Sequence, residues 1–397
     1  MRVGMVSATY DPSVVNGAVR MVTLYKERLE ALGHEVTIFT LGEAEESDRE
    51  ARIVRSPGLR LGSYGYYLSM GYTREAQALL GRMDIVHCHH LMMSVEMAHR
   101  YVNCPIVYTN HTRYDLYTGT YTPLPQPAAD AIMRQVWPEF TDLADVVIVP
   151  SESVRRVLLE FGVRARIVVI ENGIVLEPFL RPRQPRAKAD FDLPESARLL
   201  VYVGRLAEEK NLDVLLRQFA VARQLIPELC LVVIGKGPQE AELRGIAGEL
   251  GPLTVIEAMA AGKPVAAVRS PGILDSVESG VTGYLTNTPE GLDAAIVALM
   301  SDPARTQAMG SAARQASMRY DIDLTVDKTV KLYEELLSTR PDIDREQPHG
   351  RWLKRTEKWS ALLDQLADMV RPSDEADAAG RSWWPRGAPG PRKQSDG

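Results

Sequence analysis

Arg2-Val-Gly-Met-Val-Ser7 is a short run that is apolar on both faces, and an amphipathic helical pattern follows it over Ala18–Leu32. Gly33 stands just past this pattern, where a glycine commonly ends a helix. A second apolar run, Glu35–Thr40, comes next. Strands that are apolar on both faces are typical of a parallel sheet covered by helices. This opening stretch therefore predicts a β-α-β unit of a doubly wound α/β fold.

The same alternation continues to residue 179. Further strands are expected at Asp84–Cys88, Pro105–Asn110, Val146–Val149 and Ile167–Ile170. Ser151 is a candidate N-cap for a helix that Gly162 closes. Residues 1–179 are therefore expected to form an N-terminal Rossmann-like domain.

A proline-rich, basic stretch interrupts the pattern at residues 180–198 and is predicted to be a linker. A second α/β series follows over residues 199–340. Its expected strands are Leu199–Val203, Leu229–Ile234, Pro264–Val268 and Thr282–Leu285, and its late helices are Gly291–Met300, Ala304–Met318 and Thr325–Leu337. The predicted fold class is α/β, with two Rossmann-like domains facing a cleft where a ligand would bind. Residues 341–397 are expected to form an amphipathic helix and a disordered tail.

Composition and charge exclude several classes of protein. The chain has 397 residues, of which 46 are basic and 52 acidic, so its net charge is −6. Nucleic-acid binding needs a basic surplus, and no nucleic-acid partner is expected. Three cysteines without a CxxC pair favour a reducing compartment. Because neither a secretory signal nor an apolar run of membrane-spanning length is found, we expect a cytoplasmic protein.

Two turns stand where phosphates could bind. Asn16-Gly17 lies between the first strand and its helix, where backbone amides and the helix dipole favour an anion, although such a dipeptide is more often a simple turn. Gly204-Arg205-Leu-Ala-Glu-Glu-Lys210 follows the first strand of the second series. Arg205 and Lys210 can converge there on a diphosphate, and a solvated surface pair is the alternative.

Two further motifs lie in the second series. Gly235-Lys-Gly237-Pro238 lacks the third glycine of a dinucleotide fingerprint, because Glu240 occupies that position, and this argues against an oxidoreductase. Glu257-Ala-Met-Ala-Ala-Gly-Lys-Pro264 offers a carboxylate that could accept two hydrogen bonds from a ribose diol. Taken alone, Glu257 would be a surface glutamate.

Taken together, and in the order in which they follow one another along the chain, these four motifs resemble those of family 4 of the retaining glycosyltransferases, which have the GT-B fold. A further segment, Asp84-Ile-Val-His-Cys-His89 followed by Tyr108-Thr-Asn-His111-Thr-Arg-Tyr114, is similar to the diacylglycerol glucosyltransferase-like subgroup. The resemblance implies transfer of a hexose, with retention of configuration, from a nucleotide sugar of the UDP-glucose or GDP-mannose type. The acceptor would be a carbohydrate or a membrane lipid such as diacylglycerol.

The resemblance also implies a set of site residues. The expected catalytic residues are His111, which would contact the transferred sugar, and Arg205 and Lys210, which would hold the donor diphosphate. Amides near Gly17 would face the diphosphate, and Glu257 would hold the ribose. The other expected donor contacts are Gly235, Leu253, Thr254 and Glu249. No metal and no cofactor is implied, since the two cations stabilise the leaving group.

The second series departs from the family in its length. Only Gln239–Ile256 separate Pro238 from Glu257, so one strand-helix-strand unit of ~30–40 residues is absent. Glu249 has the family's Glu-x7-Glu spacing to Glu257. However, Ala241–Leu250 is predicted to be the helix that follows Gly-x-Gly-Pro in the family, and Glu249 would belong to that helix. The spacing can therefore be a coincidence that arises where the missing unit leaves the chain joined, near Gly251-Pro252. The remaining strands of the second series must pair as Leu199–Val203 with Leu229–Ile234, and as Pro264–Val268 with Thr282–Leu285. A catalytically impaired relative, a binding or remnant protein, is therefore the alternative function.

His87-Cys88-His89-His90 looks like a metal cluster. Strand geometry, however, places His87 and His89 on one face and Cys88 and His90 on the other, so four ligands cannot converge. A metal site is not expected here.

Residues 51–82 are basic and aromatic in an acidic chain. They contain five arginines against one acidic residue, with four tyrosines interleaved: Arg52, Arg55, Arg60, Tyr64, Tyr66, Tyr67, Tyr72, Arg74, Glu75 and Arg82. Such a stretch suits an anionic lipid surface. Together with the resemblance, it predicts a peripheral protein on the inner face of the membrane; a solvated rim of the acceptor cleft is the alternative.

Overall fold

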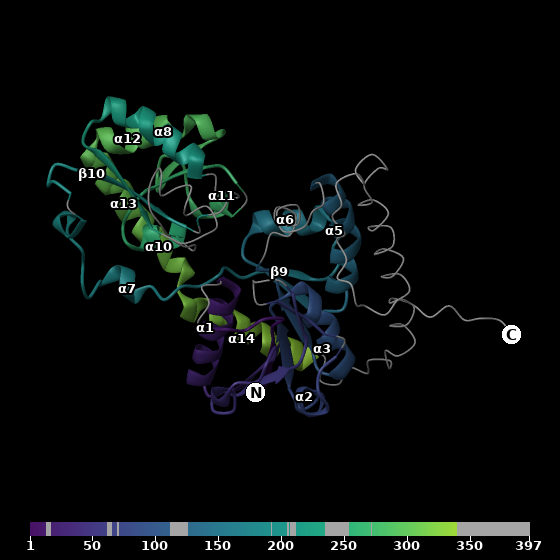
Figure 1. Cartoon of the computed structure of the whole chain (residues 1–397). Helices are drawn as coiled ribbons and strands as arrows, with labels where there is room; N and C mark the ends of the chain where they lie inside the picture. Colours follow the sequence, from purple (N-terminus) through teal and green to yellow (C-terminus); the bar gives the residue numbers. More distant parts are fainter. Residues whose placement is uncertain are drawn as a thin grey trace, which may run out of the picture. The chain divides into compact units, whose positions relative to one another are not determined.

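A parallel sheet of seven strands, in the order β3-β2-β1-β6-β7-β8-β9, forms the first half of the chain (Figure 1). Its strands are β1 Arg2–Val6, β2 Glu35–Leu41, β3 Ile53–Ser56, β6 Ile85–Cys88, β7 Ile106–Thr109, β8 Val146–Val149 and β9 Ile167–Val169. The computed structural model describes residues 1–12, 17–61, 66–69, 71–111, 126–191, 193–204, 206, 212–234, 254–270 and 272–339. Six of the seven strands lie where the sequence predicts them, and β3 was not predicted. The α/β fold class is confirmed.

The strands are buried because helices cover the sheet. Every residue of β6, β7 and β8 is buried, as expected for strands that are apolar on both faces. The helices of this half are α1 Gly17–Ala31, α2 Arg74–Leu80, α3 Glu96–Tyr101, α5 Gln126–Thr141 and α6 Glu152–Glu160. Two predicted helix signals are confirmed. Gly33 has a φ of +83° just past α1, and the Ser151 hydroxyl accepts a hydrogen bond from the Val154 amide at the start of α6.

The second half contains two separate pairs of parallel strands. They are β10 Arg198–Val203 with β11 Leu229–Ile234, and β12 Val265–Val268 with β13 Gly283–Thr286. These pairings confirm the prediction from sequence. Within the described part of the chain, no ladder joins one pair to the other.

Helices pack across both strand pairs. The helices are α7 Glu177–Leu180, α8 Leu212–Leu225, α10 Thr254–Ala260, α11 Ile273–Ser276, α12 Leu292–Ser301 and α13 Pro303–Ser317. Ala222 of α8 and Ile296 of α12 share a cluster against which Leu200 of β10 and Ala266 of β12 both pack. The strands are nevertheless poorly covered: the side chain of Val201, in β10, is 50% exposed, whereas the strands β6–β8 are fully buried. The shared helical layer therefore holds two strand pairs that, among the described residues, do not form one sheet.

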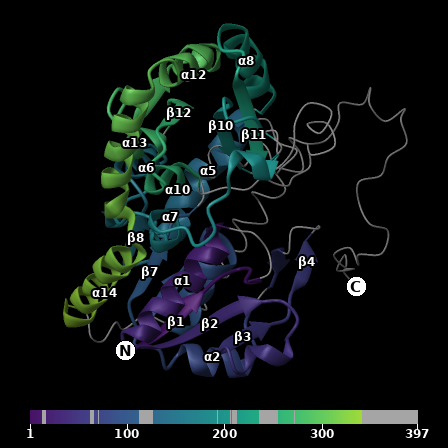
Figure 2. The same cartoon turned by 90° about the vertical axis from the view of Figure 1, so that its left-hand side faces the viewer.

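The last described helix, α14 Ile322–Thr339, belongs by sequence to the second half but packs on the first (Figure 2). The Tyr25 hydroxyl of α1 and the Thr329 hydroxyl of α14 are 3.1 Å apart. Tyr333 of α14 is fully buried in the same cluster as β1 and α1. Sequence order placed this helix with the second domain. Its buried face instead completes the core of the first, which residues 325–337 alone did not reveal.

The structure corrects part of the basic and aromatic surface predicted for residues 51–82. The side chain of Arg55 is buried, and its guanidinium donates to the Asp48 carboxylate at 2.9 Å and to the Tyr10 carbonyl at 2.8 Å. Tyr72 is buried beside the ring of Tyr101. These two side chains therefore cannot contact a lipid surface, because they are committed to the protein interior. Part of the same stretch forms an antiparallel hairpin of β4 Leu59–Leu61 and β5 Tyr66–Leu68, which the sequence did not predict.

No helix in the described ranges is both long and apolar enough to cross a membrane. The predicted helix and tail at residues 341–397 lie outside the described residues.

Candidate functional site at the carboxyl edge of the first sheet

His111 lies two residues beyond the end of β7, and His89 lies one residue beyond the end of β6. Because β6 and β7 are neighbouring parallel strands, their carboxyl ends share one edge of the sheet. The Nδ1 atom of His89 is 3.0 Å from the Nε2 atom of His111, and the two rings are nearly parallel, at 9°. The structure thus pairs the predicted sugar-binding histidine with a histidine that the sequence set aside as part of a false metal cluster.

The other two histidines of that cluster have structural partners. His87 contacts the Tyr333 hydroxyl through Nδ1 at 2.5 Å and the Thr109 hydroxyl through Nε2 at 2.6 Å. The Nδ1 atom of His90 accepts from the Ala8 amide at 3.3 Å. As the strand geometry predicted, the rings of His87 and His89 share one face, 4.2 Å apart. In the described ranges, no three His, Cys, Asp or Glu side chains are placed to hold a metal ion.

Burial keeps these imidazoles neutral. It lowers the pKa of His87 and of His111 to about 3 and that of His90 to about 4. Burial, reinforced by the neighbouring imidazoles, holds the pKa of His89 well below its usual range. Because a charged imidazole is costly in a low-dielectric environment, His111 at neutral pH can donate or accept a hydrogen bond but does not act as a cation.

Gly17 and Glu257, predicted to contact the donor from opposite halves, belong to two helices that an ion pair joins. Gly17 is the first residue of α1, and no atom lies within 4 Å of the position its Cβ would take. One turn later, Arg20 donates from Nη1 to Oε1 of Glu257 near the start of α10, at 2.9 Å. The starts of the two helices therefore meet through this ion pair.

Arg20 was missed by the sequence reasoning. A cation in the first turn of a helix is unfavourable for the helix dipole. Its position just after a glycine expected to face phosphate was the signal that could have identified it.

A second contact joins the halves near the ends of β8 and β12. The Ser153 hydroxyl of α6 donates to the Asp275 carboxylate of α11 and accepts from the Gly272 amide at 2.8 Å. Burial alone would raise the pKa of Asp275, but hydrogen bonds from Ser153 and its neighbours lower it. Asp275 is therefore held as an ionised carboxylate at this contact.

Several predicted donor residues lie outside the described residues, namely Arg205, Lys210, Gly235, Glu249 and Leu253. Thr254 is the first residue of α10, but its side chain is not described. Leu206 is fully buried with Leu212 and packs against Tyr202. This packing anchors the chain just beyond the carboxyl end of β10.

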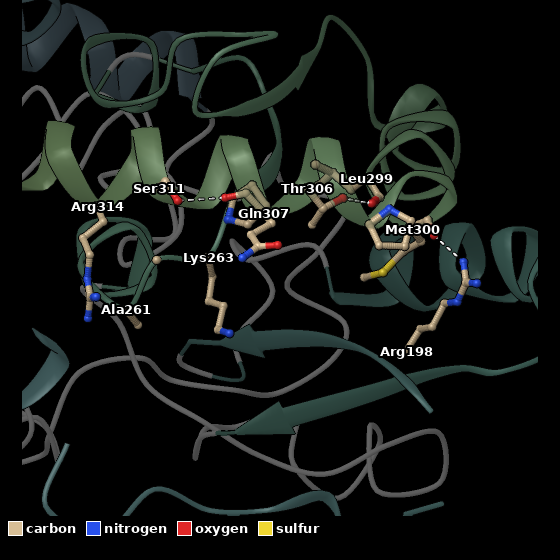
Figure 3. A pocket seen from close by; sticks show the side chains of 12 residues that line it. Arg198, Ala261, Lys263, Leu299, Met300, Thr306, Gln307, Ser311 and Arg314 are labelled. Carbon is tan, nitrogen blue, oxygen red and sulfur yellow. Dashed lines mark hydrogen bonds between the residues drawn. The ribbon is translucent and has the colours of Figure 1, made fainter. Parts of the chain in front are cut away.

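A cavity of about 500 Å³ lies elsewhere in the second half (Figure 3). It is lined by Arg198 at the start of β10, Lys263 just before β12, and Gln307 of α13. Arg198 and Arg314, also in the lining, donate to the backbone carbonyls of Met300 and Leu180. Arg198 and Lys263 stand at or just before the starts of β10 and β12, which is the opposite edge from the carboxyl ends of these strands.

Comparisons with known proteins agree with the fold and the motifs. The sequence model described as Glycosyltransferase Family 4 matches residues 15–178. The one described as Glycosyl transferases group 1 matches residues 183–252 and 246–316, in two segments. The two segments meet where we expect the shortening.

Curated relatives are similar over most of the chain. An alpha-monoglucosyldiacylglycerol synthase from Acholeplasma laidlawii is 25% identical over 395 residues, covering 85% of this chain and 98% of the relative. A D-inositol 3-phosphate glycosyltransferase from Thermobispora bispora is 26% identical over 379 residues, covering 78% of this chain and 87% of the relative. The first alignment is 395 residues long but includes only 85% of this 397-residue chain. Many of its positions therefore have no counterpart in this chain.

Solved structures share the fold. A sucrose-phosphate synthase from Thermosynechococcus elongatus has a TM-score of 0.66 at 20% identity, covering 85% of this chain and 99% of the other. The Anabaena protein HepE in complex with UDP has a TM-score of 0.64 at 15% identity, covering 84% of this chain and all of the other. With the ordered motifs and the two family matches, these findings show that the chain belongs to glycosyltransferase family 4, has the GT-B fold and matches the diacylglycerol glucosyltransferase-like subgroup.

Proposed function

We propose that this chain transfers a hexosyl group from a nucleotide sugar to a membrane lipid such as diacylglycerol, with retention of anomeric configuration. The observation that carries the proposal is the contact between Arg20 and Glu257. It joins α1, which begins at Gly17, to the carboxylate expected to hold the donor ribose. A donor lying between these helix starts would meet residues of both halves.

The donor is proposed to be of the UDP-glucose or GDP-mannose type. In support, the Anabaena HepE structures contain UDP or UDP-glucose. Arg205 and Lys210 would hold the diphosphate and stabilise the charge on the leaving group. Gly235, Leu253, Thr254 and Glu249 complete the proposed donor contacts. We propose that transfer needs neither cofactor nor divalent metal, so excess EDTA should leave the rate unchanged.

His111 is proposed to contact the transferred sugar from the first half. As a neutral imidazole it would offer a hydrogen bond to a sugar oxygen rather than a charge. We therefore expect His111→Ala to lower turnover strongly while leaving nucleotide affinity nearly unchanged. Parallel losses of activity and folding stability would instead assign His111 a structural role.

The acceptor is proposed to be a lipid reached at the inner face of the membrane. The names of the relatives from Acholeplasma laidlawii and Streptococcus pneumoniae, both alpha-monoglucosyldiacylglycerol synthases, support a lipid acceptor. Exposed Arg74 and Arg82 remain available to anionic headgroups, which attract each basic residue by about 1 kcal/mol. Sedimentation with anionic vesicles should therefore weaken at high salt, and binding that ignores lipid charge and salt would contradict this location.

The donor site is tested by a thermal-shift panel with UDP, GDP, ADP and their sugars on the full chain. A donor nucleotide should raise the melting temperature of the wild type. Arg205→Ala and Lys210→Ala should each weaken its binding by about 1.5–3 kcal/mol, as the loss of a charge-assisted hydrogen bond does. Unchanged affinity in both variants would remove these residues from the site.

A catalytically impaired relative is the second candidate, and it is favoured by the two strand pairs of the second half, which no described residues join. Exposed Val201 in β10 also indicates a weakly covered strand. Under this alternative, the wild type transfers no labelled hexose to diacylglycerol vesicles. A chimera carrying a relative's strand-helix-strand unit at Gly251-Pro252 should then gain stability and nucleotide binding together. Efficient transfer by the native chain would exclude this candidate.

A further inference from the structure

His89 is the one member of the histidine cluster that contacts His111 directly in the described part of the chain. Its side chain is 2% exposed and lies between the ring of His87 and the ring of His111. Its Nδ1 atom faces Nε2 of His111 at 3.0 Å. Its other nitrogen, Nε2, is buried and has no hydrogen-bond partner among the described residues.

Two neutral imidazoles can share this hydrogen bond in only two ways, because one nitrogen must carry a proton and the other a lone pair. If His111 donates from Nε2, then His89 carries its proton on Nε2. That places a buried N–H where no described group accepts it, which costs free energy. If His89 donates from Nδ1, its buried Nε2 keeps an unpaired lone pair instead, which also costs free energy, and His111 is protonated on Nδ1.

Asn172 distinguishes these two arrangements. Asn172 follows β9 on the carboxyl side of the same sheet, and its side chain hydrogen-bonds His111 in a way that favours the protonated ring. Such a bond runs from a ring N–H to the amide oxygen. Since Nε2 of His111 faces His89, the nitrogen that meets Asn172 is Nδ1. With Nε2 of His111 already facing Nδ1 of His89, the Asn172 interaction selects donation from His89 to His111.

We propose that His89 is a positioning residue for His111: by donating from Nδ1 to Nε2 of His111, it holds His111 as the tautomer whose Nδ1–H points toward Asn172. This role rests on the proposed function, because it matters for transfer only if His111 meets the sugar. A sugar oxygen would then replace the Asn172 amide as the acceptor of the Nδ1–H. In that arrangement His111 orients the sugar by donating a hydrogen bond, and no proton is transferred.

The tautomer is tested by long-range 1H–15N spectra of the full chain labelled with 15N-histidine. The chain has seven histidines, and His111→Asn identifies the His111 signals. We expect wild-type His111 to be neutral and protonated on Nδ1. A His111 ring protonated on Nε2 would overturn the proposal without any further variant.

Two variants of His89 test its role. His89→Phe removes the donor and should release His111 into a mixture of tautomers. His89→Asn keeps an amide donor near the former Nδ1 and should preserve the Nδ1–H form of His111. His90→Phe is the matched control, because His90 is also buried at the end of β6 but bonds to Ala8 instead. If His111 is unchanged in His89→Phe, or changes equally in His90→Phe, the proposal is refuted.

Steady-state kinetics supply a second readout. We expect His89→Phe to lower kcat about tenfold with the donor KM unchanged, and His89→Asn to recover most of that loss. A fall in kcat that His89→Asn does not recover would contradict positioning by this hydrogen bond. If the wild type turns over no donor, the proposed function fails. The tautomer of His111 in the wild type, and its response to His89→Phe, still decide whether His89 positions His111.

Discussion

Mild acid should destabilise the first half of the chain because it buries neutral histidines. The pKa of His87 and of His111 is lowered to about 3, that of His90 to about 4, and that of His89 well below its usual range. Unfolding returns each imidazole to a pKa near 6.5, the usual value. Below pH 6.5 the unfolded chain therefore binds protons that the folded chain does not, and stability falls as the pH falls.

The expected loss can be worked out per group. Between pH 6 and pH 5, each histidine that stays neutral when folded contributes a loss of about 1.2 kcal/mol. Glu96 acts in the opposite direction: burial raises its pKa to about 7, so the folded chain keeps a proton that the unfolded chain releases. Four histidines less one glutamate, which offsets about as much as one histidine loses, give a net loss of about 3.5 kcal/mol. Carboxylates with a lowered pKa, such as Asp84, add to the loss mainly below pH 5.

Urea unfolding of the full chain at pH 7, 6 and 5 measures this loss, with pulse hydrogen–deuterium labelling read on peptides that cover β6 and β7. His90→Asn is the control, because it removes one titrating ring while keeping a group that can accept from the Ala8 amide. Its stability should fall by about 1 kcal/mol less than that of the wild type between pH 6 and 5. A wild-type stability that stays level or rises over this range, or equal slopes in the two proteins, would refute the buried-histidine account.

Two substitutions test the packing of each half. Gly310→Ala would place a Cβ 2.2 Å from the Gly262 carbonyl oxygen, where α13 crosses the turn after α10. We expect thermal unfolding to show that the free energy of unfolding of the second half falls by about 1–3 kcal/mol. The control Ser311→Ala, on the same helix, should stay within about 0.5 kcal/mol of the wild type. Tyr333→Phe removes the hydroxyl that faces Nδ1 of His87. It should lower the free energy of unfolding of the first half by about 1–3 kcal/mol, because it leaves a buried nitrogen without a partner, and an unchanged urea midpoint would show that this contact contributes nothing.

The strands of both halves were largely predictable because burial on two faces leaves a local signature. Runs such as Val146–Val149 are apolar throughout, and the structure places strand β8 over the same residues. The edge strand β3, Ile53–Ser56, was missed because it contains an arginine, whose side chain the structure buries. Its identity as a strand depends on pairing with β2, which no local pattern of residues records.

The site was predictable only in part. His111 was found through a motif, and the structure describes it, whereas the roles of Gly17 and Glu257 stay predictions. The partner of His111 was not found, since His89 lies 22 residues away and looked like one member of a histidine run. Arg20 and Glu257 are 237 residues apart, so the sequence offered no reason to join them.

By itself the sequence determined the alternation of strands and helices, the parallel sheet of the first half, the strand pairs of the second half and the short connection after Pro238. These features follow from the local spacing of apolar residues and from chain length. Only the tertiary structure decided that α14 returns to the first sheet, that Arg55 and Tyr72 turn inward, and that His89 meets His111. Each of these outcomes depends on burial or hydrogen bonding between residues far apart in the chain, and such contacts exist only once the chain has folded.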